Sequence, residues 1–107
     1  KILLTISTKV WSKMDETEDE EIKLLKCVGS EIRYRILQLL REEEKCVGEI
    51  MESLDKEQTL VSHHLRRLHE CGLVEKEREG RKMIYKISDP RVLEFMEQTR
   101  ELSKTKC

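Results

Sequence analysis

The spacing of apolar residues along the chain predicts a series of helices followed by a hairpin. Four segments place apolar side chains three or four residues apart, the spacing of one helix face: 22–28, 30–43, 47–54 and 58–71. In the second segment the inward positions are Ile32, Ile36, Leu39 and Leu40, and the outward ones are Arg33, Arg35 and Arg41. Ser30 is a suitable N-cap, and Gly29 and Gly72 stand where helix C-caps are expected.

From Leu73 onward the apolar period changes from helical to two, which is typical of strands. Two strand-like runs, 73–79 and 81–88, flank the turn Glu79-Gly80-Arg81. A final helix is expected after Asp89, with Pro90 at its first position. The predicted fold is mainly α with a small β-hairpin (α+β): five helices and a two-stranded hairpin.

A polar break of three residues, 55–57, separates the helices 47–54 and 58–71. Two helices joined by so short a turn form a helix-turn-helix unit, whose second helix enters the DNA major groove. A hairpin that follows this unit is a wing. The order of elements therefore predicts a winged helix-turn-helix domain.

Residues spread over roughly 22–100 resemble the ArsR–SmtB family of winged-helix repressors. The matching positions are Ser30, Arg33, Ile36, Leu37, Ser62, His64, Leu65, Leu68, Gly72, Leu73, Val74, Gly80, Arg81 and Tyr85. The resemblance implies a sequence-specific transcriptional regulator, expected to be a repressor, that binds an inverted-repeat operator in double-stranded DNA as a homodimer. No catalytic role is expected.

The two faces of the helix 58–71 predict which residues meet DNA. Val61, His64, Leu65 and Leu68 share the buried face, and the opposite face is polar. The predicted DNA-binding residues are Gln58, Thr59, Ser62 and His63 for the bases, and Arg66, Arg81 and Lys82 for the phosphates. The alternative is an ordinary solvated helix face with a solvated turn behind it. Glu57 and Leu60 depart from the small polar residues that the family usually has there.

The net charge of −1 is unusual for a DNA-binding protein, but the charges are unevenly distributed. Residues 15–21 hold six acids, whereas residues 54–91 hold nine lysines or arginines against seven acids. The acidic block keeps an alternative open: a winged-helix protein–protein interaction module without direct DNA readout.

Apolar residues on the first and last helices exceed what a small winged core needs. The candidate dimer-interface residues are Leu24, Leu25, Val28, Phe95, Met96 and Leu102. In the resembled family these two helices form the dimer interface. The alternative is that the same residues complete the core of a monomer.

The four cysteines, at positions 27, 46, 71 and 107, form no close pair in the sequence, and reduced thiols are expected. Of the arsenic-type Cys-x-Cys of the family only Cys46 is present, because Gly48 replaces the second cysteine. The zinc-type histidine of the last helix is absent. The cadmium- or lead-type site is incomplete, with Cys71 and Cys107 but Arg67 in place of a cysteine. Two alternatives for a cofactor or sensing group therefore stay open, a thiophilic metal or a redox-active cysteine, with Cys46, Cys71 and Cys107 as candidate sensor thiols.

The chain length of 107 residues suits one domain. The expected division is an N-terminal extension over residues 1–20, with the acidic block, and a winged-helix domain with terminal dimerisation helices over 21–107. Residues 1–14 are compatible with an arm, a short helix against a partner, or a disordered tail. The sequence has no long apolar run and no signal-peptide pattern, so a cytoplasmic protein is expected, without contact to a membrane.

Overall fold

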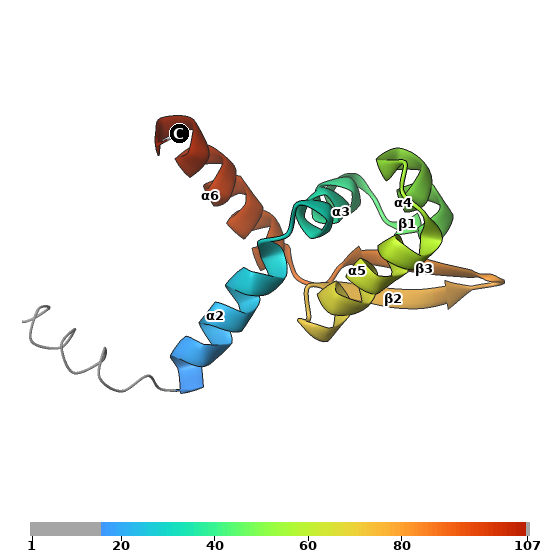
Figure 1. Cartoon of the computed structure of the whole chain (residues 1–107), viewed down its shortest axis with the longest axis horizontal. Helices are drawn as coiled ribbons and strands as arrows, with labels where there is room; N and C mark the ends of the chain where they lie inside the picture. Colours follow the sequence, from blue (N-terminus) through green and yellow to red (C-terminus); the bar gives the residue numbers. More distant parts are fainter. Residues whose placement is uncertain (1–15, 107) are drawn as a thin grey trace, which may run out of the picture.

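The computed structural model describes residues 16–106 (Figure 1). The first 15 residues and Cys107 lie outside the described residues, as do the expectations for an N-terminal arm and for a thiol at Cys107. The elements follow the predicted order: α2 (Glu16–Val28), α3 (Glu31–Glu42), β1 (Lys45–Cys46), α4 (Val47–Leu54), α5 (Gln58–Glu70), β2 (Val74–Glu79), β3 (Lys82–Ile87) and α6 (Pro90–Lys106). The described part thus contains the five helices and the hairpin that the sequence predicts.

The sheet has one strand more than the two expected. Its order is β1-β3-β2, with antiparallel pairing throughout, and Lys45 and Cys46 of β1 lie opposite Tyr85 and Ile84 of β3. A strand of two residues has no period that a sequence pattern could reveal. Its pairing is determined by the position of β3, which comes some 40 residues later in the chain.

Local signals end and begin the helices where they were predicted to. The backbone N–H of Arg33 donates to Ser30 Oγ at 3.3 Å, and that of Arg91 donates to Asp89 Oδ1 at 2.8 Å. Gly72 follows α5 with a φ of 79°, and Gly80 makes the hairpin turn with a φ of 63°. Both backbone conformations favour glycine, because a Cβ atom is crowded there.

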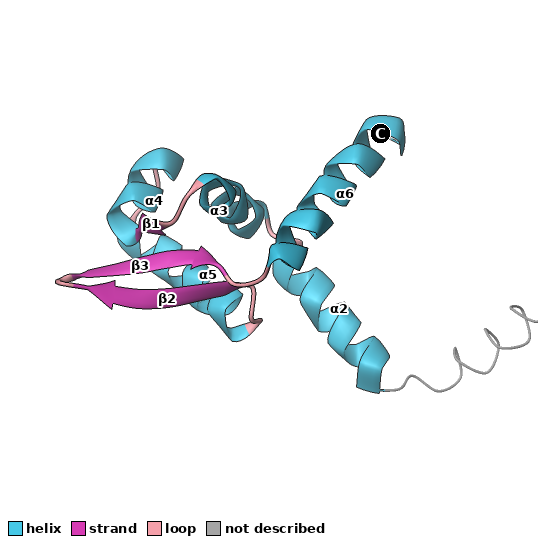
Figure 2. Cartoon of the chain, turned by 180° about the vertical axis from the view of Figure 1, so that it is seen from behind, coloured by secondary structure: helices cyan, strands magenta, loops and turns pink. Residues whose placement is uncertain are grey.

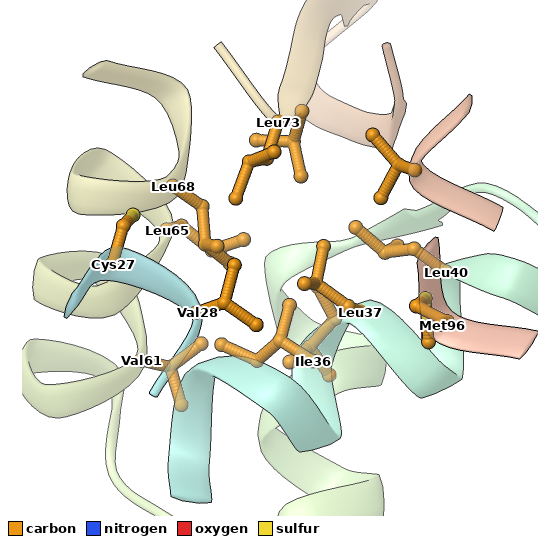
Figure 3. Close-up of a cluster of buried hydrophobic side chains, with 13 residues drawn as sticks. Cys27, Val28, Ile36, Leu37, Leu40, Val61, Leu65, Leu68, Leu73 and Met96 are labelled. Atoms are coloured by element: carbon orange, nitrogen blue, oxygen red, sulfur yellow. The ribbon is translucent and has the colours of Figure 1, made fainter. Parts of the chain in front are cut away.

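The core contains 13 buried apolar residues and lies between α3, α5 and the start of α6 (Figure 3). Val61, Leu65 and Leu68 of α5 are fully buried, as the helical spacing predicts. Val28 and Met96 also belong to this core, with exposed fractions of 8% and 1%. These two predicted interface residues are therefore used inside one protomer. None of the described polar or charged residues is buried.

Cys27 and Cys71 form a disulfide, with their Cα atoms 6.8 Å apart. The expectation of reduced thiols is therefore wrong for this pair. Position 27 is the penultimate residue of one helix, and position 71 follows another helix, 44 residues later. Only the packing of α2 against α5 brings them together, so the spacing of cysteines along the sequence could not reveal the bridge.

The winged body and the terminal helices occupy opposite ends of the described structure. Figure 1 shows α2 and α6 projecting from one end, while the tip of the β2–β3 hairpin extends at the other. The view from behind shows the same separation (Figure 2). Among the helices of residues 16–106, none is long and apolar enough to cross a membrane.

Candidate nucleic-acid interface

A turn of three residues joins α4 to α5 and sets the angle of the helix-turn-helix unit. Asp55 caps α4 in the left-handed conformation, with a φ of 56°. Its backbone N–H donates to the carbonyl oxygen of Met51, and that of Lys56 donates to the same oxygen at 3.2 Å. These bonds satisfy the end of α4 and turn the chain sharply into α5.

The outward face of α5 presents the residues that the sequence predicts to read bases. Gln58, Thr59 and His63 are exposed and Ser62 is half-buried, while the opposite face of the helix is in the core. Arg66 is exposed on the same outward side. The four base-reading candidates lie in the N-terminal half of α5, the half that reaches base edges in helix-turn-helix proteins.

The wing tip adds two exposed cations, Arg81 and Lys82, at the turn between β2 and β3. Glu79 lies opposite Lys82 in the last pair of the hairpin. The positive charge of the tip is therefore local and partly offset by neighbouring carboxylates on β2. It suits contact with a few phosphates better than a broad electrostatic attraction.

Two residues at the start of α5, Glu57 and Leu60, are less suited to DNA contact than small polar residues would be. Glu57 occupies the N-cap position, and its side chain makes no capping hydrogen bond. Its side chain is exposed and lines the same surface cleft as Asp55, so two carboxylates lie close to the start of α5. Leu60 is half-buried and offers no hydrogen-bonding group.

Arg33 connects α5 to α2 and α3, a role that its predicted outward position did not suggest. The side chain is half-buried, and its Nε donates to the carbonyl oxygen of Cys27 at 2.6 Å. Its terminal nitrogen lies 3.1 Å from Nδ1 of His64. Because a guanidinium group only donates, His64 accepts at Nδ1 and is neutral. Burial, followed by the charge of Arg33, lowers the pKa of His64 below its ordinary value.

Comparison with known proteins identifies the family. The sequence profile described as "Bacterial regulatory protein, arsR family" matches residues 30–76, the stretch from the start of α3 into the wing. The uncharacterised regulator Rv0081 of Mycobacterium tuberculosis is 33% identical over 81 residues, which cover 75% of this chain and 71% of that protein. This chain belongs to the arsR family of bacterial regulatory proteins.

Two further comparisons place this ArsR-family chain among regulators. The transcriptional repressor SmtB of M. tuberculosis is 38% identical over 74 residues, covering 69% of this chain and 55% of the repressor. The chain thus matches only about half the length of that repressor. The crystal structure of Rv0081 superposes with a TM-score of 0.81 at 28% identity, covering 85% of this chain and 92% of that one. ArsR-family proteins are DNA-binding transcriptional regulators and not enzymes.

A structural relative is a homodimer. The winged helix-turn-helix domain of Mb0332 from Mycobacterium bovis, which is described as homodimeric, superposes with a TM-score of 0.77 at 27% identity. The superposition covers 82% of each chain. A homodimeric arrangement is therefore compatible with the fold of this ArsR-family chain.

The exposed large apolar side chains of the described residues all lie on α2 and α6. They are Ile22, Leu24, Leu25, Phe95 and Leu102. Leu25 and Leu102 are 58% and 59% exposed, so they face away from the core. A cleft of about 370 Å³ lies between these helices and the body, with Leu24, Leu73 and Phe95 in its lining. Sequence reasoning missed Ile22 here and included Val28 and Met96, which are in the core.

The remaining described cysteine, Cys46, is half-buried and unbridged at the start of α4. Its backbone N–H donates to Glu49 Oε1 at 2.9 Å, and this bond lowers the pKa of Glu49. Among residues 16–106, no group of three or more histidines, cysteines or acids is placed to hold a metal ion.

Proposed function

We propose that this protein is a homodimeric repressor that binds an inverted-repeat operator through α5 and the wing. The observation that carries the proposal is the division of the molecule into two ends. A polar, exposed face of α5 lies with the basic wing tip, and the exposed apolar residues gather on α2 and α6. One end is suited to DNA and the other to a second copy of the chain.

In this proposal Gln58, Thr59, Ser62 and His63 contact base edges in the major groove. Their amide, hydroxyl and imidazole groups both donate and accept hydrogen bonds, as discrimination between base pairs requires. Arg66, Arg81 and Lys82 contact phosphates and hold the helix in register. The weak basic charge and the acidic Glu57 favour modest affinity for random DNA, so sequence readout carries a large share of the binding.

The dimer forms through Leu24, Leu25, Phe95 and Leu102, with Val28 and Met96 supporting these residues from the core. Full burial of a fully exposed leucine or phenylalanine contributes about 1.5–3 kcal/mol, and these side chains, which are 36–59% exposed, gain the corresponding part of it. A two-fold pair presents its recognition helices about one DNA turn, roughly 34 Å, apart. The matching operator is therefore an inverted repeat.

Repression is favoured over activation because the related SmtB is a repressor. We place the protein in the cytoplasm with the DNA that it regulates. The inducing signal in this proposal acts on cysteine thiols, with Cys71 beside the recognition helix and Cys46 and Cys107 as further candidates. A thiophilic metal is the less supported signal, because the described residues bring no three ligands together.

The test is selection of bound duplexes from a random pool, followed by fluorescence anisotropy on the selected site. We expect an inverted repeat and a homodimer bound per site. Arg66→Ala should weaken binding about tenfold or more, equivalent to the 1–3 kcal/mol of one good contact. Arg67→Ala is the matched control, because Arg67 lies at the α2 side of the helix and pairs with Glu70 at 3.3 Å. It should bind like the wild type.

Two results would overturn the proposal. One is the absence of any selected sequence, with no binding to duplex DNA at low salt. In that case capture of a defined protein partner would point to the interaction-module alternative. The other is equal loss of affinity in the Arg66 and Arg67 variants, which would mean that the outward face of α5 is not the reading face.

A further inference from the structure

The Cys27–Cys71 disulfide joins the predicted dimerisation helix to the end of the recognition helix. Cys27 is the penultimate residue of α2, and Cys71 immediately follows α5. The exposed Leu24 and Leu25 precede Cys27 in the same helix. The bridge is thus a covalent link between the part of the molecule suited to a second copy and the part suited to DNA.

The two sulfur atoms differ in their access to solvent. Cys27 is 1% exposed and packs into the core beside Leu65 and Leu68 (Figure 3), with its Sγ 3.6 Å from the carbonyl oxygen of Arg67. Cys71 is half-buried and lines a surface cleft of about 320 Å³. A small molecule that enters this cleft reaches Cys71 and not Cys27.

The charges around the cleft favour a negatively charged small molecule. Lys23 pairs with Glu20 at 3.4 Å, and Arg67 pairs with Glu70 at 3.3 Å. Lys26 also lines the cleft, and its charge is the one left uncompensated among these lining residues. A thiolate, or a small thiol that carries a carboxylate, is therefore attracted weakly to the mouth of the cleft.

A second link between the same helices runs through Arg33. It donates to the carbonyl oxygens of Cys27 and Lys26 at the end of α2 and contacts His64 in the middle of α5. The bridge holds the C-terminal end of α5, and Arg33 holds its middle. With both in place the angle between α2 and α5 is determined at two points. Without the bridge, Arg33 still joins the middle of α5 to the end of α2, but the covalent link at the C-terminal end of α5 is lost.

We propose that the Cys27–Cys71 bridge is a thiol-responsive switch on the recognition helix, opened and closed by a small-molecule thiol–disulfide couple that enters at Cys71. This inference rests on the proposed DNA-binding function and names its regulation. It assigns a role to Cys27, which sequence reasoning did not include among the sensor thiols.

The chemistry is a two-electron exchange. A thiolate attacks Cys71 Sγ, the Cys27–Cys71 bond breaks, and Cys27 leaves as a thiolate that takes up a proton. A second thiol then attacks the mixed disulfide at its small-molecule sulfur. Cys71 is released as a thiol and the small molecule departs as its disulfide. Closing runs the same steps in reverse, with the small disulfide as the oxidant.

The closed bridge favours operator binding because it orders the recognition helix before DNA arrives. In a dimer held together through α2, the angle between α2 and α5 sets the spacing of the two recognition helices. When the bridge is open, the angle between α2 and α5 is less restricted. Fixing this angle on binding to DNA then uses part of the binding free energy. We expect operator affinity to fall about fivefold or more on opening, which is the lower end of ordinary coupling between sites. By reciprocity, bound operator protects the bridge from reduction by the same factor.

The experiment measures operator affinity of the full-length protein in two buffers of glutathione, one oxidised and one reduced. Circular dichroism and thermal unfolding in each buffer report the fraction folded. We expect weaker binding in the reduced buffer while the protein remains folded. Cys27→Ser and Cys71→Ser should bind like the reduced wild type in both buffers. Cys46→Ser and Cys107→Ser test the two other candidate thiols, and both variants should keep the full redox response if the bridge is the switch.

Peptide mapping tests the point of entry. Partial reduction with glutathione, acid quenching and trypsin digestion separate the two cysteines, into the peptides 27–33 and 68–76. We expect the mixed disulfide on the peptide that contains Cys71. A mixed disulfide on the Cys27 peptide would overturn the proposed route.

The outcomes separate this inference from the function on which it rests. Binding to the operator with equal affinity in both buffers, with only the unfolding temperature changed, would show that the bridge is a structural crosslink. Tighter binding in the reduced buffer would overturn the proposed direction. No operator binding in either buffer would overturn the DNA-binding proposal itself.

Discussion

The guanidinium group of Arg33 lies 3.1 Å from Nδ1 of His64 and so joins the start of α3 to the recognition helix across 31 residues of sequence. The contact requires a neutral imidazole, because protonation would place two cations against each other. Burial and the charge of Arg33 lower the pKa of His64 accordingly. The position of α5 in the domain is therefore coupled to the protonation state of His64.

The first prediction is a loss of stability in mild acid that depends on His64. As the pH falls below the ordinary value of 6.5, the unfolded chain takes up this proton before the folded protein does. As the pH falls from 6.5 to the lowered pKa, the free energy of unfolding should therefore decrease. Above pH 6.5 the free energy of unfolding should no longer depend on this group. Urea unfolding at a series of pH values measures this slope.

His64→Gln should flatten this part of the pH profile, because its side chain does not titrate. His69→Gln is the control from the exposed face of the same helix and should keep the wild-type slope. A profile that His64→Gln leaves unchanged would contradict the prediction.

The second prediction concerns salt dependence. If Arg81 binds a phosphate, Arg81→Ala should reduce the slope of log affinity against log salt by about 0.9 for each phosphate that the variant no longer neutralises. For a dimer with two bound wings the slope falls by about 1.8. Anisotropy titrations between roughly 50 and 200 mM salt measure the slope. Lys104→Ala, which removes an α6 cation close to Glu101, should not change it.

The third prediction uses the unsuitable N-cap of α5. Glu57→Ser should stabilise the protein by about 1 kcal/mol, because a serine hydroxyl can accept a backbone N–H of the first turn. It should also strengthen operator binding by removing a negative charge near the phosphates. Denaturant unfolding and anisotropy measure the two effects.

Glu57→Gln separates the two contributions, since it removes the charge without supplying a good cap. It should strengthen DNA binding with little gain in stability. Equal stability of all three proteins would mean that the cap position is already satisfied in another way.

The fourth prediction tests the dimer surface. Leu25→Glu places a charge on the exposed face of α2 and should weaken the dimer about tenfold or more, or 1.4 kcal/mol. Sedimentation equilibrium measures the dissociation constant, and circular dichroism should show an unchanged fold. Ile84→Glu, a similar replacement on the wing surface, should leave the dimer intact. A variant Leu25→Glu that dimerises like the wild type would move the interface elsewhere.

Much of the candidate DNA interface could be predicted from the sequence, because it depends on one helix and one hairpin. The spacing of Val61, Leu65 and Leu68 identifies the buried face of α5, and the outward face follows by geometry. The cap at Ser30 and the hairpin turn at Gly80 depend on residues at most a few positions apart. Whether the outward residues read bases stays a prediction.

The features missed by sequence reasoning are those made by distant segments. Met96 carries the same apolar pattern as Leu102, yet one is in the core and the other is exposed. Periodicity reveals that a helix has an apolar side but not how far along the helix the body of the protein covers it. The division between core and dimer surface on α6 was therefore not predictable.

The bridge on which the further inference depends is the clearest case. The sequence by itself determined that α5 is an amphipathic helix ending near Cys71, and that α2 ends near Gly29. Only the tertiary structure decided that Cys27 and Cys71 meet and that Arg33 reaches His64. Helical periodicity is a property of neighbouring residues, whereas these contacts depend on how α2, α3 and α5 pack. That packing results from burial of the whole core at once, which no local pattern encodes.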